Sequence, residues 1–268
     1  MTLPILVTSP RITPDSVALM EAAMASEQKA LRLPSFRPTD EVQNVPIAVY
    51  GESLFAIILT SKLNHLLIEP TPAWLPDMPA EYTQRELIVM KLGEARQLTI
   101  PRFVKTADGT KGFEAKVYKS GVGLPGLDFY PDDHEVLVSE PVTWEVEYRC
   151  FVRERELLTL SVYMRNGELA LSDSGVWLEN TSETGAARQF CESLLQDQTV
   201  DIPPACVIDV GRISKRGWAV VEANPAYGSG IYGCDPVKTL KVINRTTIQV
   251  DAVTETDAPW VKTYVVGD

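Results

Sequence analysis

The chain has 268 residues, of which 45% are hydrophobic and 23% are charged; this composition is typical of a globular protein and excludes a disordered one. The formal net charge of -11 makes the surface acidic, so duplex nucleic acid, whose phosphates it would repel, is not expected as a partner. The four cysteines form no C-x-x-C pair and there are only two histidines, which excludes a zinc knuckle, a thioredoxin motif and a polyhistidine metal site.

The first 79 residues alternate between strand and helix patterns. Apolar runs predict strands at residues 3–7, 47–50 and 65–68. Helices are predicted after Thr13-Pro14, where proline suits the first helical position, and over residues 52–63. The alternation indicates a small α/β domain, and the proline-rich segment 70–79 is predicted to connect it to the rest of the chain.

From residue 81 onwards the predicted elements are mostly strands. A helix is expected over residues 81–98, and another over residues 185–196. Strands are predicted at residues 102–105, 113–118, 135–139, 143–152, 157–164, 206–213 and 218–223. Two strand-like runs follow at residues 246–253 and 260–266, for which the sequence suggests no function.

The last predicted hairpin carries three oxygen-bearing side chains. Strand alternation places Trp218, Val220, Glu222 and Asn224 on one face, and Asp209 lies on the partner strand. Two carboxylates and an amide on adjacent antiparallel strands suit a hard cation such as Mg²⁺, which prefers oxygen ligands completed by phosphate or water. An ordinary hairpin with solvated acidic side chains is the alternative that this spacing leaves open.

The predicted strand at residues 143–152 has one apolar face and one charged face. The apolar face comprises Trp144, Val146, Tyr148, Cys150 and Val152. The other comprises Glu145, Glu147, Arg149, Phe151 and Arg153. Such a charged face is typical of an antiparallel sheet with one wet side. It is also compatible with a cleft in which Arg149 binds phosphate and a glutamate binds a ribose hydroxyl.

The segment from Phe103 to Gly112 combines a strand, Lys105 and a glycine-bearing turn. Backbone amides in such a turn can bind a phosphate, to which the lysine adds a positive charge. The spacing is not that of a Walker A motif, and a plain hairpin is the alternative.

Gly228 to Gly233 matches the pattern G-x-G-x-x-G of dinucleotide-binding turns. That motif should open a βαβ unit, but here only a short tail follows, and Asp235-Pro236 predicts the start of a separate helix. A Rossmann site is therefore disfavoured. A serine or cysteine nucleophile with a histidine partner is not indicated either.

Several of these segments stand in an order that resembles a known family. They are Phe103-Val104-Lys105, residues 138–142, residues 147–152, Asp209, and Glu222-Ala223-Asn224-Pro225. This order resembles the ATP-grasp superfamily, and most of all its divergent clade named for two arginines and a lysine, which includes bacterial and phage proteins and a eukaryotic assembly factor for translation initiation. The resemblance covers residues 81–241 well and the first 70 residues loosely.

The resemblance implies which residues bind the nucleotide. Lys105 is expected to contact its phosphates. Glu140 and Val142 are expected to form the hinge that binds adenine, Val142 through its backbone. Glu147 is expected near the ribose or a substrate amine.

The resemblance also implies which residues act on the transferred phosphate. Arg149 matches one arginine of the clade, and Arg85, on the helix predicted before the core, is the candidate for the other. The expected Mg²⁺ ligands are Asp209, Glu222 and Asn224.

The phosphate-binding loop departs from the family pattern. Many members have proline after the first lysine, where this chain has Thr106, and the loop to Gly112 is short and poor in glycine. Lys111 and Lys116 are alternatives for a second phosphate-binding lysine. These departures bear on loop closure and turnover more than on nucleotide binding.

The resemblance implies a mixed α/β and α+β chain with the ATP-grasp fold. Residues 1–79 would form the N-terminal α/β domain, residues 80–245 two lobes that clamp ATP, and residues 246–268 a tail. The implied activity is ATP- and Mg²⁺-dependent ligation of a carboxylate to an amine or thiol through an acyl phosphate, without a protein nucleophile. An ATP-binding assembly module with little turnover and a kinase-like phosphoryl transfer are the alternatives.

The expected partners are ATP, Mg²⁺ and a carboxylate and an amine, which could belong to a peptide, a protein terminus, an amino acid or a small metabolite. Nucleic acid and membranes are not expected. A cytoplasmic protein with reduced cysteines is expected, because residues 1–8 lack the pattern of a signal peptide and no apolar run is long enough to span a bilayer.

Overall fold

The protein is described here by a computed structural model covering residues 3–107 and 112–264. The N-terminal region is a three-stranded parallel sheet in the order β2-β1-β3 with a helix on each face. Its elements are β1 (Ile5–Thr8), α1 (Pro14–Ala25), β2 (Ala30–Arg32), η1 (Asp40–Val42), β3 (Ile47–Tyr50) and α2 (Ser53–Lys62). Alternation along β1 explains the layers, since Leu6 packs with α1 and Val7 packs with α2. The predicted α/β unit is confirmed, including the cap that Thr13 provides for α1.

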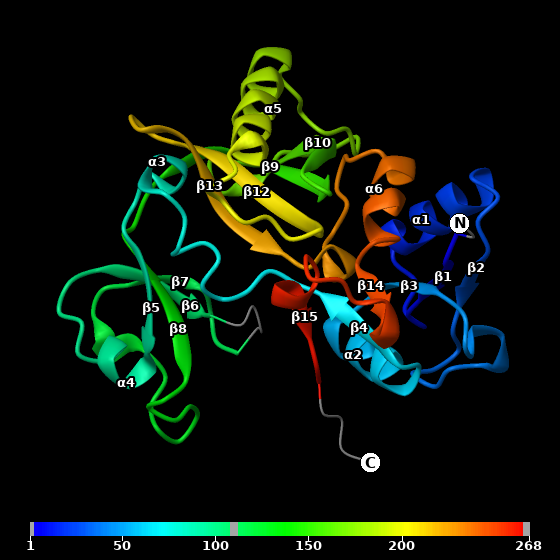
Figure 1. Cartoon of the computed structure of the whole chain (residues 1–268). Helices are drawn as coiled ribbons and strands as arrows, with labels where there is room; N and C mark the ends of the chain where they lie inside the picture. The colour runs from blue at the N-terminus through cyan, green and yellow to red at the C-terminus, as the bar shows by residue number, and fades with distance from the viewer. Residues whose placement is uncertain (1–2, 108–111, 265–268) are drawn as a thin grey trace.

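The tail of the chain completes this region. Strand β4 (His65–Ile68) pairs antiparallel with both β14 (Thr247–Gln249) and β15 (Val261–Lys262). The two strand-like runs of the tail are therefore strands, shorter than predicted because η4 (Val250–Ala252) and η5 (Ala258–Trp260) lie between them. The last residues of the second run lie outside the described residues. Figure 1 shows β4 and β15 near the centre of the molecule.

A smaller lobe is formed by a four-stranded antiparallel sheet in the order β5-β8-β6-β7. Its strands are β5 (Leu87–Lys91), β6 (Arg102–Thr106), β7 (Lys116–Tyr118) and β8 (Glu135–Ser139), with η2 (Gly121–Gly123) after β7. The helix predicted over residues 81–98 is wrong. That segment forms α3 (Ala80–Thr83), β5 and α4 (Leu92–Ala95), because Gln84 adopts a left-handed φ of 52° that ends α3 and the apolar run from Leu87 pairs with β8.

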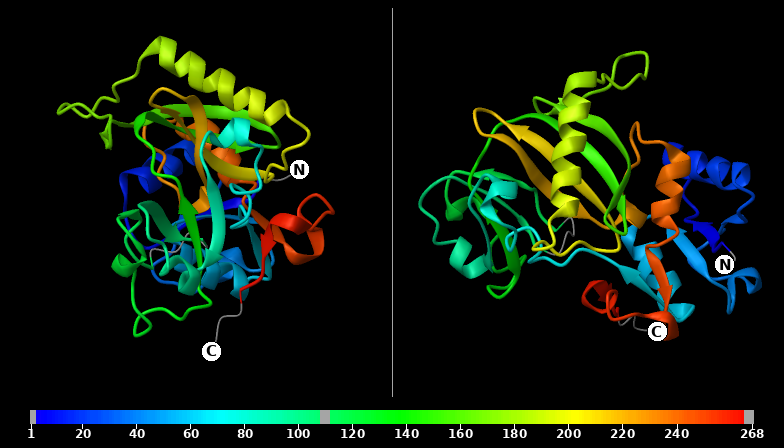
Figure 2. Two further views of the ribbon diagram at one scale, coloured as in Figure 1. Left: turned by 90° about the vertical axis from the view of Figure 1, so that its left-hand side faces the viewer. Right: turned by 45° about the horizontal axis from the view of Figure 1, so that its top comes forward.

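A larger lobe is formed by a five-stranded antiparallel sheet in the order β11-β10-β9-β12-β13. Its elements are β9 (Trp144–Arg153), β10 (Glu156–Arg165), β11 (Glu168–Leu169), α5 (Thr181–Gln196), β12 (Ala205–Ile213), β13 (Gly217–Asn224), η3 (Ala226–Gly228) and α6 (Pro236–Ile243). Helix α5 covers one face, and α6 with α1 covers part of the other. Figure 2 shows α5 lying along the outer face.

The cysteines and the helices of the described residues bear on the composition of the core. All four cysteines are buried free thiols that pack in the core. Within the described residues, no helix is long and apolar enough to cross a bilayer. The part of the inner face of the larger sheet that α6 leaves uncovered faces the smaller sheet, and the candidate site lies there.

Candidate functional site

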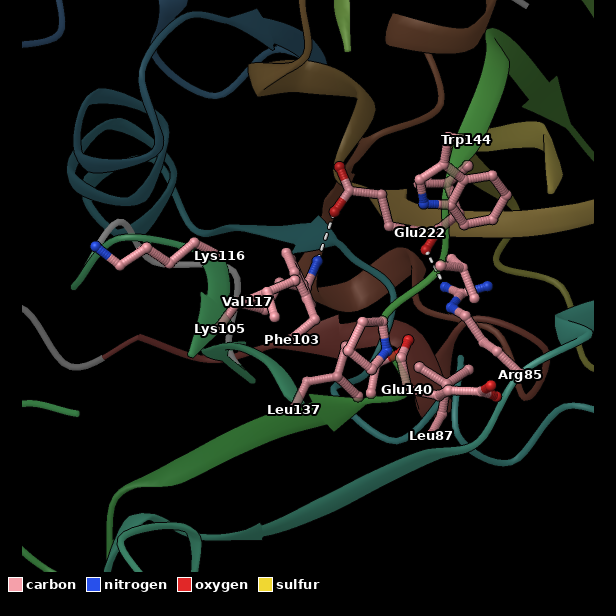
Figure 3. A pocket seen from close by; sticks show the side chains of 14 residues that line it. Arg85, Leu87, Phe103, Lys105, Lys116, Val117, Leu137, Glu140, Trp144 and Glu222 are labelled. Atoms are coloured by element: carbon pink, nitrogen blue, oxygen red, sulfur yellow. Dashed lines mark hydrogen bonds and ion pairs between the residues drawn. The ribbon is translucent and has the colours of Figure 1, made fainter. Parts of the chain in front are cut away.

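A cavity of about 360 Å³ lies between the two sheets. Its apolar walls come from both lobes, and its charged side chains lie around these walls (Figure 3). The lining residues are Arg85, Leu87, Phe103, Lys105, Lys116, Val117, Leu137, Ser139, Glu140, Pro141, Val142, Trp144, Val221 and Glu222. Concave, mostly apolar surfaces with a few convergent polar groups are typical of small-molecule sites.

The chain crosses between the lobes at residues 140–142, which line this cavity and include the predicted hinge residues Glu140 and Val142. The carboxylate of Glu140 accepts two hydrogen bonds from Arg216, at 2.6 and 3.0 Å, and Arg216 also donates to the carbonyl of Gln84. The hydrogen bonds from Arg216 lower the pKa of Glu140 to about 2. The hinge is therefore fixed to the turn between β12 and β13, a contact that no pattern in the sequence indicates.

The two lobes meet through Lys105 on β6 and Glu222 on β13. The ammonium of Lys105 donates to one oxygen of Glu222, and Asn224 donates to the other at 2.9 Å. Burial alone would raise the pKa of Glu222, but the charge of Lys105 holds it below its ordinary value. Lys116 points away from Glu222 (Figure 3) and pairs with Glu114. Lys111 lies outside the described residues.

The three predicted metal ligands lie together, but the predicted face of β13 is wrong in part. Asp209 pairs with Glu222, and the next residue of β12, Val210, pairs with Val220, so Val221 is an extra residue in a β-bulge. Val220 packs in the core beneath α5, whereas Glu222 faces the cavity. Simple alternation placed Trp218, Val220 and Glu222 on one face of β13. Because of the bulge, Glu222 lies on the face opposite Trp218 and Val220.

A similar irregularity corrects the predicted apolar face of β9. The register shifts between Arg212 and Ile213, which leaves Glu145 as the extra residue. Trp144 consequently lines the cavity and does not pack beneath α5 with Val146. Glu145 pairs with Arg212 at 2.7 Å.

Arg149 and Asp209 form a bidentate ion pair on the inner face of the larger sheet. The two hydrogen bonds measure 3.0 and 2.7 Å, and the side chains are 8% and 0% exposed. Burial opposes the charge of Arg149, but Asp209 raises the pKa of its guanidinium. The guanidinium also packs over the rings of Tyr232 and Tyr163, 4.7 and 5.2 Å from their centroids. These contacts fix Arg149 in one orientation.

Glu147 lies on the same face of β9 as Arg149, near the carboxylates of Asp209 and Glu222. It accepts a hydrogen bond of 2.8 Å from Tyr163. Burial raises its pKa, and the charges of Asp209 and Glu222 raise it further. Three carboxylates thus gather within electrostatic reach of one another.

Arg85 lines the cavity but does not lie on a helix, which corrects the prediction for its local structure. It follows Gln84 in the connection from α3 to β5. Its guanidinium donates to the carbonyls of Val220 at 2.7 Å and Val221 at 2.8 Å and lies 4.9 Å from the ring centroid of Trp144.

The Gly228–Gly233 segment forms no dinucleotide-binding turn. It follows η3, and α6 begins separately at Pro236, capped by the side chain of Asp235. The carbonyl of Gly230 accepts a hydrogen bond of 3.0 Å from Arg149, and the amide of Ile231 donates to Asp15 of α1 at 3.1 Å. The segment instead links the site to the N-terminal sheet.

The family model for the ATP-grasp domain of the two-arginine-one-lysine clade, family 2, matches residues 82–242, more than half of the chain. The chain belongs to this ATP-grasp family. The range contains both lobes, the hinge and the cluster of charged side chains, so the predicted ATP-grasp fold and clade are confirmed. None of the curated protein sequences compared with the chain matches it.

Several solved structures are similar to this chain at low sequence identity, and the first of them has a TM-score above 0.5. A RimK-domain ATP-grasp protein from Sphaerobacter thermophilus DSM 20745 is 15% identical, with a TM-score of 0.52, and the match covers 91% of this chain and 98% of that one. The D-alanine–D-alanine ligase of Bacillus anthracis is 12% identical, with a TM-score of 0.48 and a match covering 91% and 97%. The ATP-grasp ligase PsnB, solved with a minimal precursor, Mg and ADP, is 11% identical, with a TM-score of 0.46 and coverage of 91% and 99%.

Asp209, Glu222 and Asn224 carry side-chain oxygens, the ligand type that a hard divalent cation prefers. Asp209 and Glu222 occupy paired positions, and the amide oxygen of Asn224 stays available as a metal ligand because the amide nitrogen makes the hydrogen bond to Glu222. Across residues 3–107 and 112–264, no group of three His, Cys, Asp or Glu side chains is arranged to hold a metal. The donor set therefore needs the amide and further oxygens from a ligand.

Sequence reasoning misses several residues of the ATP-grasp cavity. Phe103 shares a face with Lys105, so strand alternation could have identified it. Leu137 and Leu87 lie on strands whose pairing partners the sequence does not specify. Simple alternation puts Trp144 on the wrong face. Outside the cavity, Tyr232, which packs against Arg149, is covered by the sequence analysis only as part of the glycine motif.

Proposed function

We propose that this ATP-grasp domain is an ATP- and Mg²⁺-dependent ligase that joins a carboxylate to an amine or thiol. The observation that carries the proposal is the contact between Lys105 of the smaller lobe and Glu222 of the larger one, both of which line the largely apolar cavity between the lobes. A nucleotide with its base in the apolar part would bring its phosphates to this pair. The division at residues 79/80 and 245/246 belongs to the same proposal. The pairing of β14 and β15 with β4 supports a boundary near residue 245, because it joins the tail to the N-terminal region and not to the lobes.

The nucleotide would be held by residues from both lobes. Phe103 and Leu137 would pack against the adenine, while backbone groups of Glu140 and Val142 would bind its polar edge. Lys105 would transfer its hydrogen bond from Glu222 to a phosphate oxygen. Lys116 remains the candidate for a second phosphate contact, because it lines the same cavity.

The reaction would proceed in two displacements. A carboxylate oxygen of the substrate attacks the γ-phosphorus and ADP leaves, which gives an acyl phosphate. The amine or thiol then attacks the acyl carbon, loses its proton and displaces inorganic phosphate. Arg149, fixed by Asp209 and two tyrosine rings, would orient the transferred phosphate.

The metal would be held by Asp209, Glu222 and Asn224, and when bound it would offset charge on the phosphate oxygens. Glu147 lies next to two of these residues, which favours a place at the phosphate end of the nucleotide over contact with the base. From this position Glu147 could contact either the ribose or an incoming amine. Arg85, the candidate for the second arginine of the clade, lines the wall of the cavity.

The test is calorimetric titration of ATP into the native chain with and without Mg²⁺, repeated on Glu222→Gln. We expect Mg²⁺ to tighten ATP binding to the native chain and to have little effect in the variant. Glu135→Gln is the matched control, since Glu135 is an exposed carboxylate that pairs with Lys91 at the far end of β8. Equal Mg²⁺ dependence in native and Glu222→Gln chains would rule out the metal assignment.

Product analysis separates a ligase from the other two functions. Phosphate release that requires both a carboxylate and an amine supports the ligase. Metal-dependent ATP binding without phosphate release under any substrate would favour an assembly module, and a stable phosphorylated acceptor would favour phosphoryl transfer.

A further inference from the structure

We propose that Arg85 is a positioning residue that holds the β-bulge of β13 and thereby aims Glu222 into the nucleotide cavity. The proposal rests on the proposed function in one respect, that Glu222 contributes to metal-dependent nucleotide binding. It assigns Arg85 a task other than direct contact with phosphate.

The bulge decides which way Glu222 points. Val220 packs in the core beneath α5, and in a regular strand the residue two positions later would point to the same side. The extra residue, Val221, reverses the alternation, so Glu222 lies opposite Asp209 and faces Lys105. A regular β13 would turn the carboxylate toward α5, away from the cavity.

The carbonyls of the bulge are bound by Arg85. One terminal nitrogen of the guanidinium donates to the carbonyl of Val220 at 2.7 Å, and the other donates to that of Val221 at 2.8 Å. The first nitrogen also donates to the carbonyl of Thr83 at 3.0 Å, which ties the group to the connection before β5. A planar guanidinium with several donors can bind two successive carbonyls at once, and β13 is an edge strand with a strand partner on one side only.

A second set of contacts holds the guanidinium in place. Its central carbon lies 4.9 Å from the ring centroid of Trp144. That ring in turn lies against Gly211 of β12, where an added Cβ would come within 2.7 Å of it. Arg85, Trp144 and Gly211 thus form a layer beneath the bulge, built from three different segments of the chain.

These contacts distinguish positioning from phosphate binding. The hydrogen bonds of Arg85 are made to backbone carbonyls, and Lys105 is the cation that contacts Glu222 directly. Loss of Arg85 should therefore affect the part of ATP affinity that depends on the metal, and leave metal-free ATP binding nearly unchanged.

The experiment compares Arg85→Met with Arg102→Met, a matched control whose guanidinium pairs with the exposed Glu86 outside the cavity. We expect Arg85→Met to raise the Mg²⁺ concentration for half-maximal ATP binding by about 10–100-fold, the usual effect of removing a group that orients a metal ligand. Arg85→Lys, which keeps a donor for the carbonyls, should recover part of the loss. An unchanged Mg²⁺ requirement, or an equal loss of metal-free ATP binding, would overturn the proposal.

A nucleotide-free measurement keeps this proposal separate from the proposed function. Amide hydrogen exchange over residues 217–224 should be several-fold faster in Arg85→Met than in the native chain and unchanged in Arg102→Met. If the native chain bound no ATP, the proposed function would fail, while this exchange difference would still support the bracing of the bulge. Unchanged exchange over residues 217–224 would refute the bracing whatever the nucleotide results.

Discussion

At the scale of single residues, the site compensates its own charges. Lys105 neutralises Glu222 across the cavity, and Arg149 neutralises Asp209 within the larger sheet. Desolvated charges are tolerated when they are paired and hydrogen-bonded in this way. Under the proposed function, a metal that binds alone would have to displace Lys105 from Glu222, whereas a metal that binds together with a nucleotide would offer Lys105 a phosphate in exchange.

Lys105→Met is expected to have opposite effects on two ligands. ATP affinity should fall by about tenfold or more, because a charge-assisted hydrogen bond of roughly 1.5–3 kcal/mol is lost. Binding of Mn²⁺ without nucleotide should become tighter than in the native chain, because Glu222 loses its cation. Calorimetry with Mn²⁺ alone and with ATP alone tests both; Mn²⁺ affinity that does not change would show that Lys105 does not block the metal ligands.

The Arg216–Glu140 pair at the hinge predicts a pH dependence. The hydrogen bond from Arg216 lowers the pKa of Glu140 from 4.5 to about 2, so its stabilisation is present above pH 4.5 and is lost as the pH falls toward 2. Arg216→Met should lower Tm by about 1–3 °C near pH 7 and by clearly less near pH 2, where Glu140 is largely protonated and the bond to the Gln84 carbonyl remains. Arg188→Met, which removes an exposed helical pair, is the control. A Tm difference that stays constant with pH would contradict this assignment.

Single residues are predictable where alternation is regular. Residue type and spacing identify Lys105, Glu222 and Asn224, and the structure brings the first two into contact. The same alternation puts Trp144 and Val220 on the wrong faces, because each lies next to a bulge and the sequence carries no local mark of an extra residue.

At the scale of elements, two glycines differ in how much space surrounds the position of a Cβ atom. A Cβ at Gly211 of β12 would come within 2.7 Å of the Trp144 ring and 2.9 Å of the carbonyl oxygen of Val146. Gly185 of α5 has open space around its missing Cβ and a helical conformation.

Gly211→Ala should lower the free energy of unfolding by about 1–3 kcal/mol, since the ring and the backbone beside it must shift. Gly185→Ala should raise it by roughly 0.5–1 kcal/mol, because alanine loses less backbone entropy in a helix. Urea unfolding of both variants measures the two effects. Equal effects of the two substitutions would mean that Trp144 can move freely away from β12.

Helices and strands are predictable from local patterns, except where pairing with a distant strand decides whether a segment is helix or strand. Thr13-Pro14 and Asp235-Pro236 start helices as predicted, because proline and capping residues act locally. The helix predicted over residues 81–98 is wrong because the apolar positions there suit either period, and the pairing of β5 with β8 is invisible in the sequence.

At the scale of the whole molecule, the carboxylate of Glu69 joins three distant segments. It follows β4 and accepts hydrogen bonds from Tyr227 in η3 and from Tyr264 in the tail, the latter at 2.9 Å. The turn that follows Asn224 is thereby tied to the strand that β14 and β15 complete.

Tyr227→Phe should lower the free energy of unfolding by about 1–3 kcal/mol, because Glu69 is buried and loses a donor. Tyr82→Phe, which removes a hydroxyl bonded to the more accessible Asp197, should cost about 1 kcal/mol or less. Thermal unfolding compares the two variants. A smaller effect for Tyr227 than for Tyr82 would mean that Glu69 finds another donor.

The sheet around β4 also has a consequence for how the protein is made. Strand β4 is synthesised well before its two partners, and the amides of Gln28 and Asn244, 216 positions apart, exchange hydrogen bonds in the same region. While the chain leaves the ribosome, both edges of β4 lack these partners until β14 and β15 have been made. The N-terminal region is thus completed only after both lobes have been synthesised, and it is where we expect nascent chains to need protection from aggregation.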